Sequence, residues 1–398
     1  MTISKGTIAR YTEDFFPEIL QTRKYLHKNP ELSFEEYKTA QFIKTELKEL
    51  EIEFSDGYVK TGIVGIIKGK NPGKKTVALR ADIDALPIQE LNETDYKSKI
   101  PGVMHACGHD VHTSSLLGTA KILQHLKDQF EGTVLLVFQP GEEKLPGGAK
   151  LMLEAGALKN PKPDIIIGQH VMPGLQSGKV GFRQGMYMAS TDEIYLTVKG
   201  KGGHAAMPHQ VTDSVLIASH IIVALQQIVS RNAIPFIPTV LSFGKVEAKG
   251  ATNIIPAEVK VEGTFRTMDE TWRKEAHKKI KAICESVSTA MGASCDIEIK
   301  PGYPFLINDD EITKKAKTYA EDILGKNEVV DLDLRMTAED FAYYSQQFPS
   351  TFYRLGITDK KGKNSHPLHS PYFDIDEEAL KTGMKLMAWL AVSFLNET

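Results

Sequence analysis

The sequence predicts an α/β fold that carries a second, inserted α/β domain. In the first third of the chain, short runs rich in Val and Ile alternate with helical segments, which is typical of a sheet covered by helices. The middle third has the order strand, helix, strand, strand, helix, strand, which is the ferredoxin-like signature. The length of 398 residues is enough for two or three domains.

The first domain is predicted from segments at both ends of the chain. Its N-terminal part has helices predicted over 15–29, 35–50 and 114–126 and buried strands over 63–67, 76–81, 133–138 and 164–168. The C-terminal part has helices over 311–324, 338–348 and 377–394 and one strand over 351–355. We expect residues 1–184 and 303–398 to form one mixed-sheet α/β/α domain.

The inserted domain is predicted over residues 185–302. Its strands are expected at 193–199, 239–246, 258–266 and 295–300, and its helices at 213–229 and 271–291. The resulting βαββαβ order is self-contained.

Composition and charge exclude several classes of protein. Hydrophobic residues make up 41% and charged residues 25%, which excludes wholesale disorder. Lys and Arg total 48 against 51 Asp and Glu, so the basic excess of a nucleic-acid or anionic-membrane binder is absent. The longest apolar stretch, 216–229, is interrupted by polar residues, and a membrane-spanning helix needs ~20 mostly apolar residues. We expect neither nucleic acid nor membrane as a partner.

The compartment follows from the N-terminus and the cysteines. Residues 1–10 lack the apolar region of a secretory signal. Three cysteines do not make a disulfide framework in a chain of this size. The expected location is the reducing cytoplasm.

Side chains able to bind metal follow several predicted strands. Asp82 and Asp84 follow one strand, Glu142-Glu143 a second and His170 a third. Between them, the window 105–112 holds three histidines and one cysteine, and His369 lies far downstream. Since α/β sheets place ligands at the carboxyl ends of their strands, we expect these groups to meet in one cleft.

Each group also has a structural interpretation. Asp82 and Asp84 are ordinary turn or N-cap residues when taken alone. Adjacent glutamates in a loop are usually solvated, and a histidine that ends a buried strand is usually a satisfied core residue. The 105–112 window is harder to explain structurally, and coincidence does not account well for the whole set.

The types of ligand indicate the metal. Thiolate, imidazole and carboxylate together suit zinc, with manganese, cobalt or nickel as alternatives, whereas calcium and magnesium want more oxygen ligands. Cys107 could bridge two ions that share a hydroxide. Of the Glu142-Glu143 pair, one carboxylate would bind metal, and the other would take a proton from the metal-bound water and pass it to a leaving amine.

Several long motifs in the right order resemble one family. They are Arg23 to Glu31, Arg80 to Pro87, Met104 to His112, Pro140 to Glu143, Gly200 to His209 and Leu368 to Pro371. With these motifs the chain resembles the metallopeptidase family of aminoacylases and carboxypeptidases. It is most similar to the amidohydrolase branch that holds hippurate hydrolase, auxin-conjugate hydrolases and N-acetyldiaminopimelate deacetylase. The match runs nearly end to end.

The resemblance implies a dinuclear catalytic domain with a lid and dimerisation domain, and it implies a role for each site residue. The implied metal ligands are Cys107, His109, Glu143, His170 and His369. Glu142 would be the general base, and Asp84 would orient a ligand. From the lid, His204 would stabilise the oxyanion, and Asn253 and Arg266 would hold the substrate carboxylate. Most of the wider family has a histidine where this chain has Asp82.

The expected activity is hydrolysis of N-acyl-amino acids by a metal-bound hydroxide, in a homodimer or larger homo-oligomer. A dipeptidase or carboxypeptidase would use the same site. An N-acetyldiaminopimelate-specific deacetylase and a non-catalytic binding protein are further alternatives. A structural zinc module is disfavoured, because it would want a closed, usually Cys-rich cluster.

Overall fold

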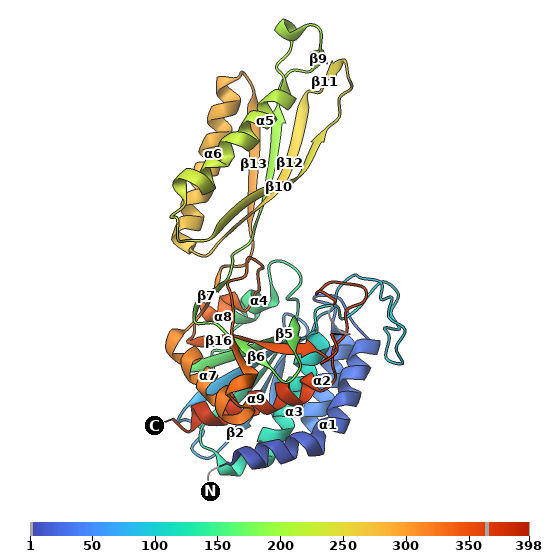
Figure 1. Cartoon of the computed structure of the whole chain (residues 1–398), viewed down its shortest axis with the longest axis vertical. Helices are drawn as coiled ribbons and strands as arrows, with labels where there is room; N and C mark the ends of the chain where they lie inside the picture. The colour runs from blue at the N-terminus through green and yellow to red at the C-terminus, as the bar shows by residue number, and fades with distance from the viewer. Residues whose placement is uncertain (1–2, 363–365, 398) are drawn as a thin grey trace. The chain divides into compact units, whose positions relative to one another are not determined.

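The computed structural model describes residues 3–362 and 366–397 and divides into two compact units (Figure 1). Unit 1 comprises Met1–Gly185, Ile307–Asp333 and Asp340–Thr398. Unit 2 comprises Met186–Leu306 and Leu334–Glu339. The segment 334–339, which the sequence assigned to the first domain, therefore groups with the inserted one.

Unit 1 is built on an eight-stranded mixed sheet with the order β1-β2-β4-β3-β5-β16-β6-β15. The strands β4, β3, β5 and β16 run parallel at its centre. Every residue of β3 and β4 is buried, as expected for parallel strands covered on both faces. The strand bounds are β1 (Glu53–Tyr58), β2 (Gly62–Lys68), β3 (Thr76–Asp82), β4 (Thr133–Gln139), β5 (Ile165–Gln176), β6 (Val180–Phe182), β15 (Val329–Asp331) and β16 (Ser350–Thr358).

The helices of unit 1 pack in layers against this sheet. α3 and α9 pack against each other and against β3, and α1 covers both helices. α3 is buried over most of its length, because the sheet, α1 and α9 surround it. The helix bounds are α1 (Lys5–Lys28), α2 (Tyr37–Glu49), α3 (His109–Leu126), α4 (Gly148–Glu154), α7 (Asp310–Leu324), α8 (Ala342–Ser345) and α9 (Ala379–Leu395).

One predicted helix of unit 1 is largely wrong. The sequence predicts a helix over 338–348, whereas α8 covers Ala342–Ser345 alone and begins without a side-chain cap. Asp340 is engaged elsewhere: its carboxylate accepts hydrogen bonds from Arg80 Nη2 at 2.8 Å and from Ala149 N at 2.9 Å. Those buried contacts hold the chain before α8 in a non-helical path.

Unit 2 has the predicted βαββαβ order. Its antiparallel sheet has the order β10-β12-β8-β13, and α5 and α6 pack against it around a core that includes Ile194, Ile221 and Ile280. A short pair, β9 and β11, lies at one end of this sheet (Figure 1). The bounds are β8 (Asp192–Lys199), β9 (Gly203–His204), α5 (Ser214–Leu225), β10 (Thr239–Ala248), β11 (Ile254–Ile255), β12 (Glu258–Thr267), α6 (Glu270–Ala290) and β13 (Ser294–Pro301). Two short strands, β7 (Gly185–Met188) and β14 (Leu306–Asn308), lie where the chain passes between the units.

The sequence predicts no stretch that could span a membrane, and the segment Ser214–Asn232 departs from this expectation. By length and composition it is apolar enough to cross one. It joins α5 to a π-helical turn at Ile228–Asn232, and Ile217, Ile221 and Leu225 are buried in the core of unit 2. One such helix, with a face in the core of a folded unit, is weak evidence for a membrane span.

Candidate metal centre

The neighbouring parallel strands β4, β3 and β5 bring the predicted ligands to one edge of the sheet of unit 1. Asp82 ends β3 and lies opposite Gln139, the last residue of β4, so that Glu142 and Glu143 follow at the same edge. His170 lies on β5, two residues beyond Gly168, which pairs with β3. Carboxyl ends of parallel strands meet at the same edge, which explains the convergence.

A glycine allows the loop before α3 to enter this edge. Gly108 has φ +79° and is the N-cap of α3, and a Cβ there would lie 2.5 Å from Val171 Cγ2. A larger residue would meet both the backbone strain and this clash. The glycine therefore lets Cys107 and His109 flank the turn with both side chains buried.

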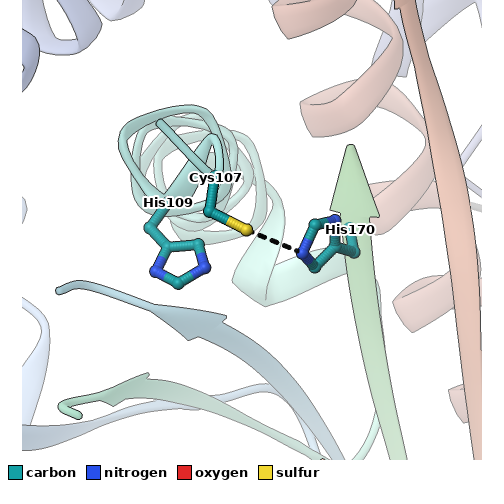
Figure 2. Close-up of side chains that lie close together, drawn as sticks. All are labelled: Cys107, His109 and His170. Carbon is teal, nitrogen blue, oxygen red and sulfur yellow. Dashed lines mark hydrogen bonds between the residues drawn. The ribbon is translucent and has the colours of Figure 1, made fainter. Parts of the chain in front are cut away.

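The predicted ligands form overlapping groups of possible metal-binding atoms. Cys107 Sγ lies 3.4 Å from His170 Nε2, with His109 beside them (Figure 2). Cys107 also groups with Glu143 and His369, whose Nε2 lies 3.3 Å from Glu143 Oε1. Cys107 is thus common to a group with two imidazoles and a group with carboxylate and imidazole.

Hydrogen bonds at Nδ1 fix the orientation of two of the histidine rings. His170 Nδ1 donates to Val171 O at 2.7 Å, and His109 Nδ1 donates to Asp84 O at 2.9 Å. Each ring then presents Nε2 to the site, as metal-ligating histidines usually do. Asp84 Oδ1 also lies 3.2 Å from His109 Nδ1, the position expected of a residue that orients this ring.

The charges of the site fit a bound cation. Burial lowers the pKa of His109, but Asp82 and Asp84 outweigh it and raise the pKa to about 10. Nε2 of this ring is buried and has no hydrogen-bond partner among residues 3–362 and 366–397. Burial and then Glu143 raise the pKa of the Cys107 thiol well above its usual value. A divalent cation would take the place of the imidazole proton and stabilise the thiolate.

Burial and then Arg354 hold the pKa of His170 well below its usual value, so that this ring is neutral, as a ligand must be. His369 is half exposed and has φ +64°, and its backbone N donates to Ala106 O at 2.8 Å. A hydrogen bond to Glu143 raises the pKa of His369. The sulfur, nitrogen and oxygen donors of the five residues together suit zinc and related transition metals.

Asp82 and His112 lie beside this centre but are committed to other partners. His112 Nε2 accepts a hydrogen bond from Val171 N at 2.9 Å, so Nδ1 carries the proton and donates to Asp82 Oδ1 at 2.5 Å. Arg80 Nη1 donates to Asp82 Oδ2 at 2.6 Å. Burial raises the pKa of Asp82, but His109, His112 and Arg80 outweigh it, and the carboxyl stays ionised.

Glu142 is buried next to the candidate ligands and forms a group with His109 and Glu143. Of the two residues that hold its loop, sequence reasoning missed Glu36, whereas Asp84 was expected to orient a ligand. Gly141 N donates to Glu36 Oε1 at 2.9 Å, and Glu143 N donates to Asp84 Oδ2 at 3.0 Å. Glu36 carried no sequence signal of its own, because a Glu pair at the start of a helix is commonplace.

The three predicted residues of unit 2 do not gather in one place. His204 is exposed on β9, where it pairs with Ile254 of β11, and Ala205 N donates to Asn253 O at 3.0 Å. Arg266 lies near the other end of β12, eight residues beyond Glu258, or about 27 Å along an extended strand. Its Nη1 donates to Met336 O at 3.0 Å. Asn253 and Arg266 of one unit therefore cannot hold the same carboxylate.

The family model for peptidase family M20/M25/M40 matches residues 78–393, which is most of the chain. The chain belongs to this family. It is therefore a hydrolase, and the resemblance inferred from its motifs is confirmed.

Three relatives match between 78% and 97% of this chain. The N-acyl-L-amino acid amidohydrolase of Geobacillus stearothermophilus is 43% identical over 310 residues, covering 78% of this chain and 83% of the relative. The thermostable carboxypeptidase 2 of Saccharolobus solfataricus is 38% identical over 382 residues, covering 95% of this chain and 96% of the relative. The solved structure of the Bacillus subtilis YXEP protein, described as a dinuclear metal binding peptidase, is 34% identical with a TM-score of 0.84 and covers 97% of this chain and 99% of that one.

Proposed function

We propose that this M20/M25/M40 member hydrolyses the amide bond of N-acyl-amino acids, releasing a carboxylic acid and a free amino acid. The observation that carries the proposal is the buried Glu142 beside a set of candidate metal ligands. The N-acyl-L-amino acid amidohydrolase from Geobacillus supports this substrate class.

Cys107, His109, Glu143, His170 and His369 would hold two divalent ions. Zinc or manganese fits the donor set, with cobalt or nickel as alternatives, and the dinuclear description of the YXEP protein supports the number. Cys107 belongs to both groups of ligands, which supports the proposal that its thiolate would serve both ions. Bound there, the ions would supply Lewis acidity that lowers the pKa of a water and polarises the amide carbonyl.

Glu142 is the proposed general base. Its carboxylate would accept a proton from the attacking water as the new C–O bond forms. It would then return this proton to the amide nitrogen as the C–N bond breaks, so that the amine leaves neutral. Asp84 would keep His109 oriented through the hydrogen bonds at Nδ1.

Unit 2 would act as a lid that supplies substrate contacts. Arg266 is the proposed clamp for the substrate carboxylate, since guanidinium binds carboxylate through two parallel hydrogen bonds. His204 would donate to the oxyanion of the tetrahedral intermediate, and Asn253 would assist in binding. These roles rest on the motif resemblance and on the placement of the residues on the ends of the sheet.

We further propose a homodimer. Asn253 and His204 lie at the opposite end of unit 2 from Arg266. Without a change of shape within unit 2, both ends would serve one substrate if a second copy supplied His204 and Asn253. The exposed apolar side chains of α5, among them Val223 at 72% and Leu216 at 49% exposure, offer a surface on which two copies could associate.

The proposed location is the cytoplasm. Cys107 would have to remain a reduced thiolate in order to bind metal, and the cytoplasm keeps thiols reduced.

A carboxypeptidase or dipeptidase is the second candidate, because the same residues could cleave a peptide bond and the Saccharolobus relative is named a carboxypeptidase. The test is amine release by protein loaded separately with zinc and with manganese. The panel contains N-acetyl-amino acids, benzoyl-glycine, acetyl-diaminopimelate and dipeptides. We expect release from acyl-amino acids and little from dipeptides. Release mainly from dipeptides would make the enzyme a peptidase, and silence with metal bound would remove support for the function.

A further inference from the structure

A cavity of about 320 Å³ in unit 1 borders the candidate metal centre. Glu143 forms part of its wall, so the cavity reaches a residue of the centre itself. Its apolar wall is formed by Leu32, Ala85, Leu86 and Pro87. Cavities that bind small ligands typically measure ~300–1,000 Å³, so this one suits a single compact group rather than a whole large substrate.

Backbone pairing holds the apolar wall in place. Leu32 and Ala85 form a parallel bridge, and Ala85 N donates to Glu31 O at 2.8 Å. Leu86 exchanges two hydrogen bonds of 3.0 Å with Met104. Because both leucines stand on paired backbone, the cavity is preformed and a ligand need not order it.

Apart from Glu143, whose buried Oε1 belongs to the candidate metal centre, the polar groups of the cavity do not offer a buried partner to a ligand. Ser33 Oγ donates to Asp84 Oδ2 at 2.6 Å, which commits its hydroxyl proton. Glu35 and Lys144, which complete the lining, are exposed to solvent. A polar substituent placed against the leucines would lose hydrogen bonds with water without replacing them, whereas an apolar one would gain from burial.

We propose that this cavity is the acyl pocket of the enzyme and that Leu32 and Leu86 select substrates with apolar acyl groups, such as benzoyl or medium-length alkanoyl. The assignment rests on the proposed function, because it presumes that an acyl-amino acid is cleaved at the adjacent centre. The lining favours the acyl half over the amino-acid half, because the apolar wall offers nothing to a carboxylate and the cation in the lining, Lys144, is exposed to solvent.

The test compares two substrates that differ in the acyl group alone, an N-acetyl and an N-benzoyl derivative of one amino acid. Leu32→Trp fills the cavity, and we expect it to lower the benzoyl-to-acetyl ratio of kcat/KM by at least about tenfold, the scale on which hydrophobic pockets discriminate. Leu86→Ala enlarges the cavity and should shift the preference of N-alkanoyl substrates toward longer chains. Leu91→Trp, at an exposed leucine outside the lining, is the matched control and should leave the ratio unchanged.

Metal content and circular dichroism of each variant show that the centre and fold are intact, and Leu86→Ala carries the test if Leu32→Trp does not fold. Ratios within twofold of wild type in the folded variants would overturn the acyl pocket while leaving the proposed function standing. A variant Lys144→Ala that raises KM equally for both substrates would place the amino-acid carboxylate here and would also overturn it. Wild-type protein that releases no amine from either substrate would instead overturn the proposed function, and the pocket with it.

Discussion

Glu142 and Glu143 are adjacent in the chain, but their surroundings differ. Glu143 lies 3.3 Å from His369 Nε2 and 3.9 Å from His109 Nε2, between two candidate ligands. Its backbone N–H is held by Asp84. Glu142 is the more deeply buried of the two and groups with His109 and Glu143 rather than with Cys107. This placement supports the proposal that Glu143 binds metal and that Glu142 transfers the proton.

Glu142→Gln should therefore bind metal nearly normally and lose kcat by about 10²–10⁴-fold, because the amide cannot accept the proton of the attacking water. Elemental analysis of metal content and turnover of an acyl-amino acid check this. The matched variant Glu143→Gln should lose metal and activity together. If Glu142→Gln loses metal instead, the two roles are interchanged.

The histidines of the 105–112 window show what sequence could and could not predict at this scale. Their density predicted a site, and the structure brings His109 to it. The residue pattern alone did not separate His109 from His112, and the choice of His109 came from the motif resemblance. In the structure the difference is a hydrogen bond: Val171 N donates to His112 Nε2, while His109 Nε2 has no hydrogen-bond partner among the described residues. His105 is also buried, and burial lowers its pKa to about 4.

At the scale of elements, the turn between α1 and α2 supports the loop of Glu142. Phe34 has φ +67°, and its N–H donates to Glu36 Oε1 at 2.8 Å. The same carboxylate accepts from Gly141 N, and Thr61 Oγ1 donates to Oε2 at 2.7 Å. Burial, and next the nearby Asp84, raise the pKa of Glu36 to about 7. One buried carboxyl thus joins three segments of chain.

This raised pKa predicts a pH dependence of stability. The folded protein holds the Glu36 proton more tightly than the unfolded chain, whose value is about 4.5. The stabilisation that the Glu36 proton contributes to the folded protein is therefore fully present below pH ~4.5 and is lost as the pH rises toward 7. Glu36→Gln does not titrate, and its amide can keep the hydrogen bonds. Between pH 4.5 and 8, wild type should lose up to about 3 kcal/mol of unfolding free energy relative to the variant.

Urea unfolding of both proteins across this pH range measures the difference, in which the titration of all other groups cancels. Glu35→Gln is the control, because Glu35 is exposed and should give a curve parallel to wild type. Parallel curves for Glu36→Gln and wild type would contradict the raised pKa.

The elements themselves were predicted well where one periodic pattern decides the structure. The buried runs at 76–81 and 133–138 became β3 and β4, and the βαββαβ order of unit 2 is confirmed. The helix over 338–348 was wrong because Asp340 accepts hydrogen bonds from Arg80 and from Gln139, residues about 200 or more positions away in the chain. No local pattern contains such contacts, which is also why Glu36 was missed.

At the scale of the whole molecule, the residues of the proposed site are divided between the two units of the chain. Unit 1 holds the candidate ligands and Glu142, whereas His204 and Asn253 lie at the end of unit 2 opposite Arg266. A twofold dimer would let each lid serve its partner, because an isologous interface exchanges equivalent surfaces. This arrangement makes a prediction that an independent monomer does not share.

His204→Ala should keep its metal and lose kcat more than it raises KM, because the donor acts on charge that develops in the transition state. When the His204→Ala variant is refolded or co-expressed together with the inactive Glu142→Gln variant, the mixture should regain activity. If the two variants pair at random, half of the dimers are mixed. Each mixed dimer has one site with both Glu142 and the partner's His204, and its other site lacks both. The activity of the mixture should therefore approach about a quarter of the wild-type activity.

The control is a mixture of Glu142→Gln with Glu143→Gln, which should stay inactive because both changes fall in the same unit of each chain. Recovery that disappears on dilution, together with dissociation seen by sedimentation, would tie it to the dimer. If the first mixture shows no more activity than the sum of its components while mixed dimers are present, His204 acts within its own chain. The separation of His204 from Arg266 would then need movement within unit 2 to bring both to one substrate.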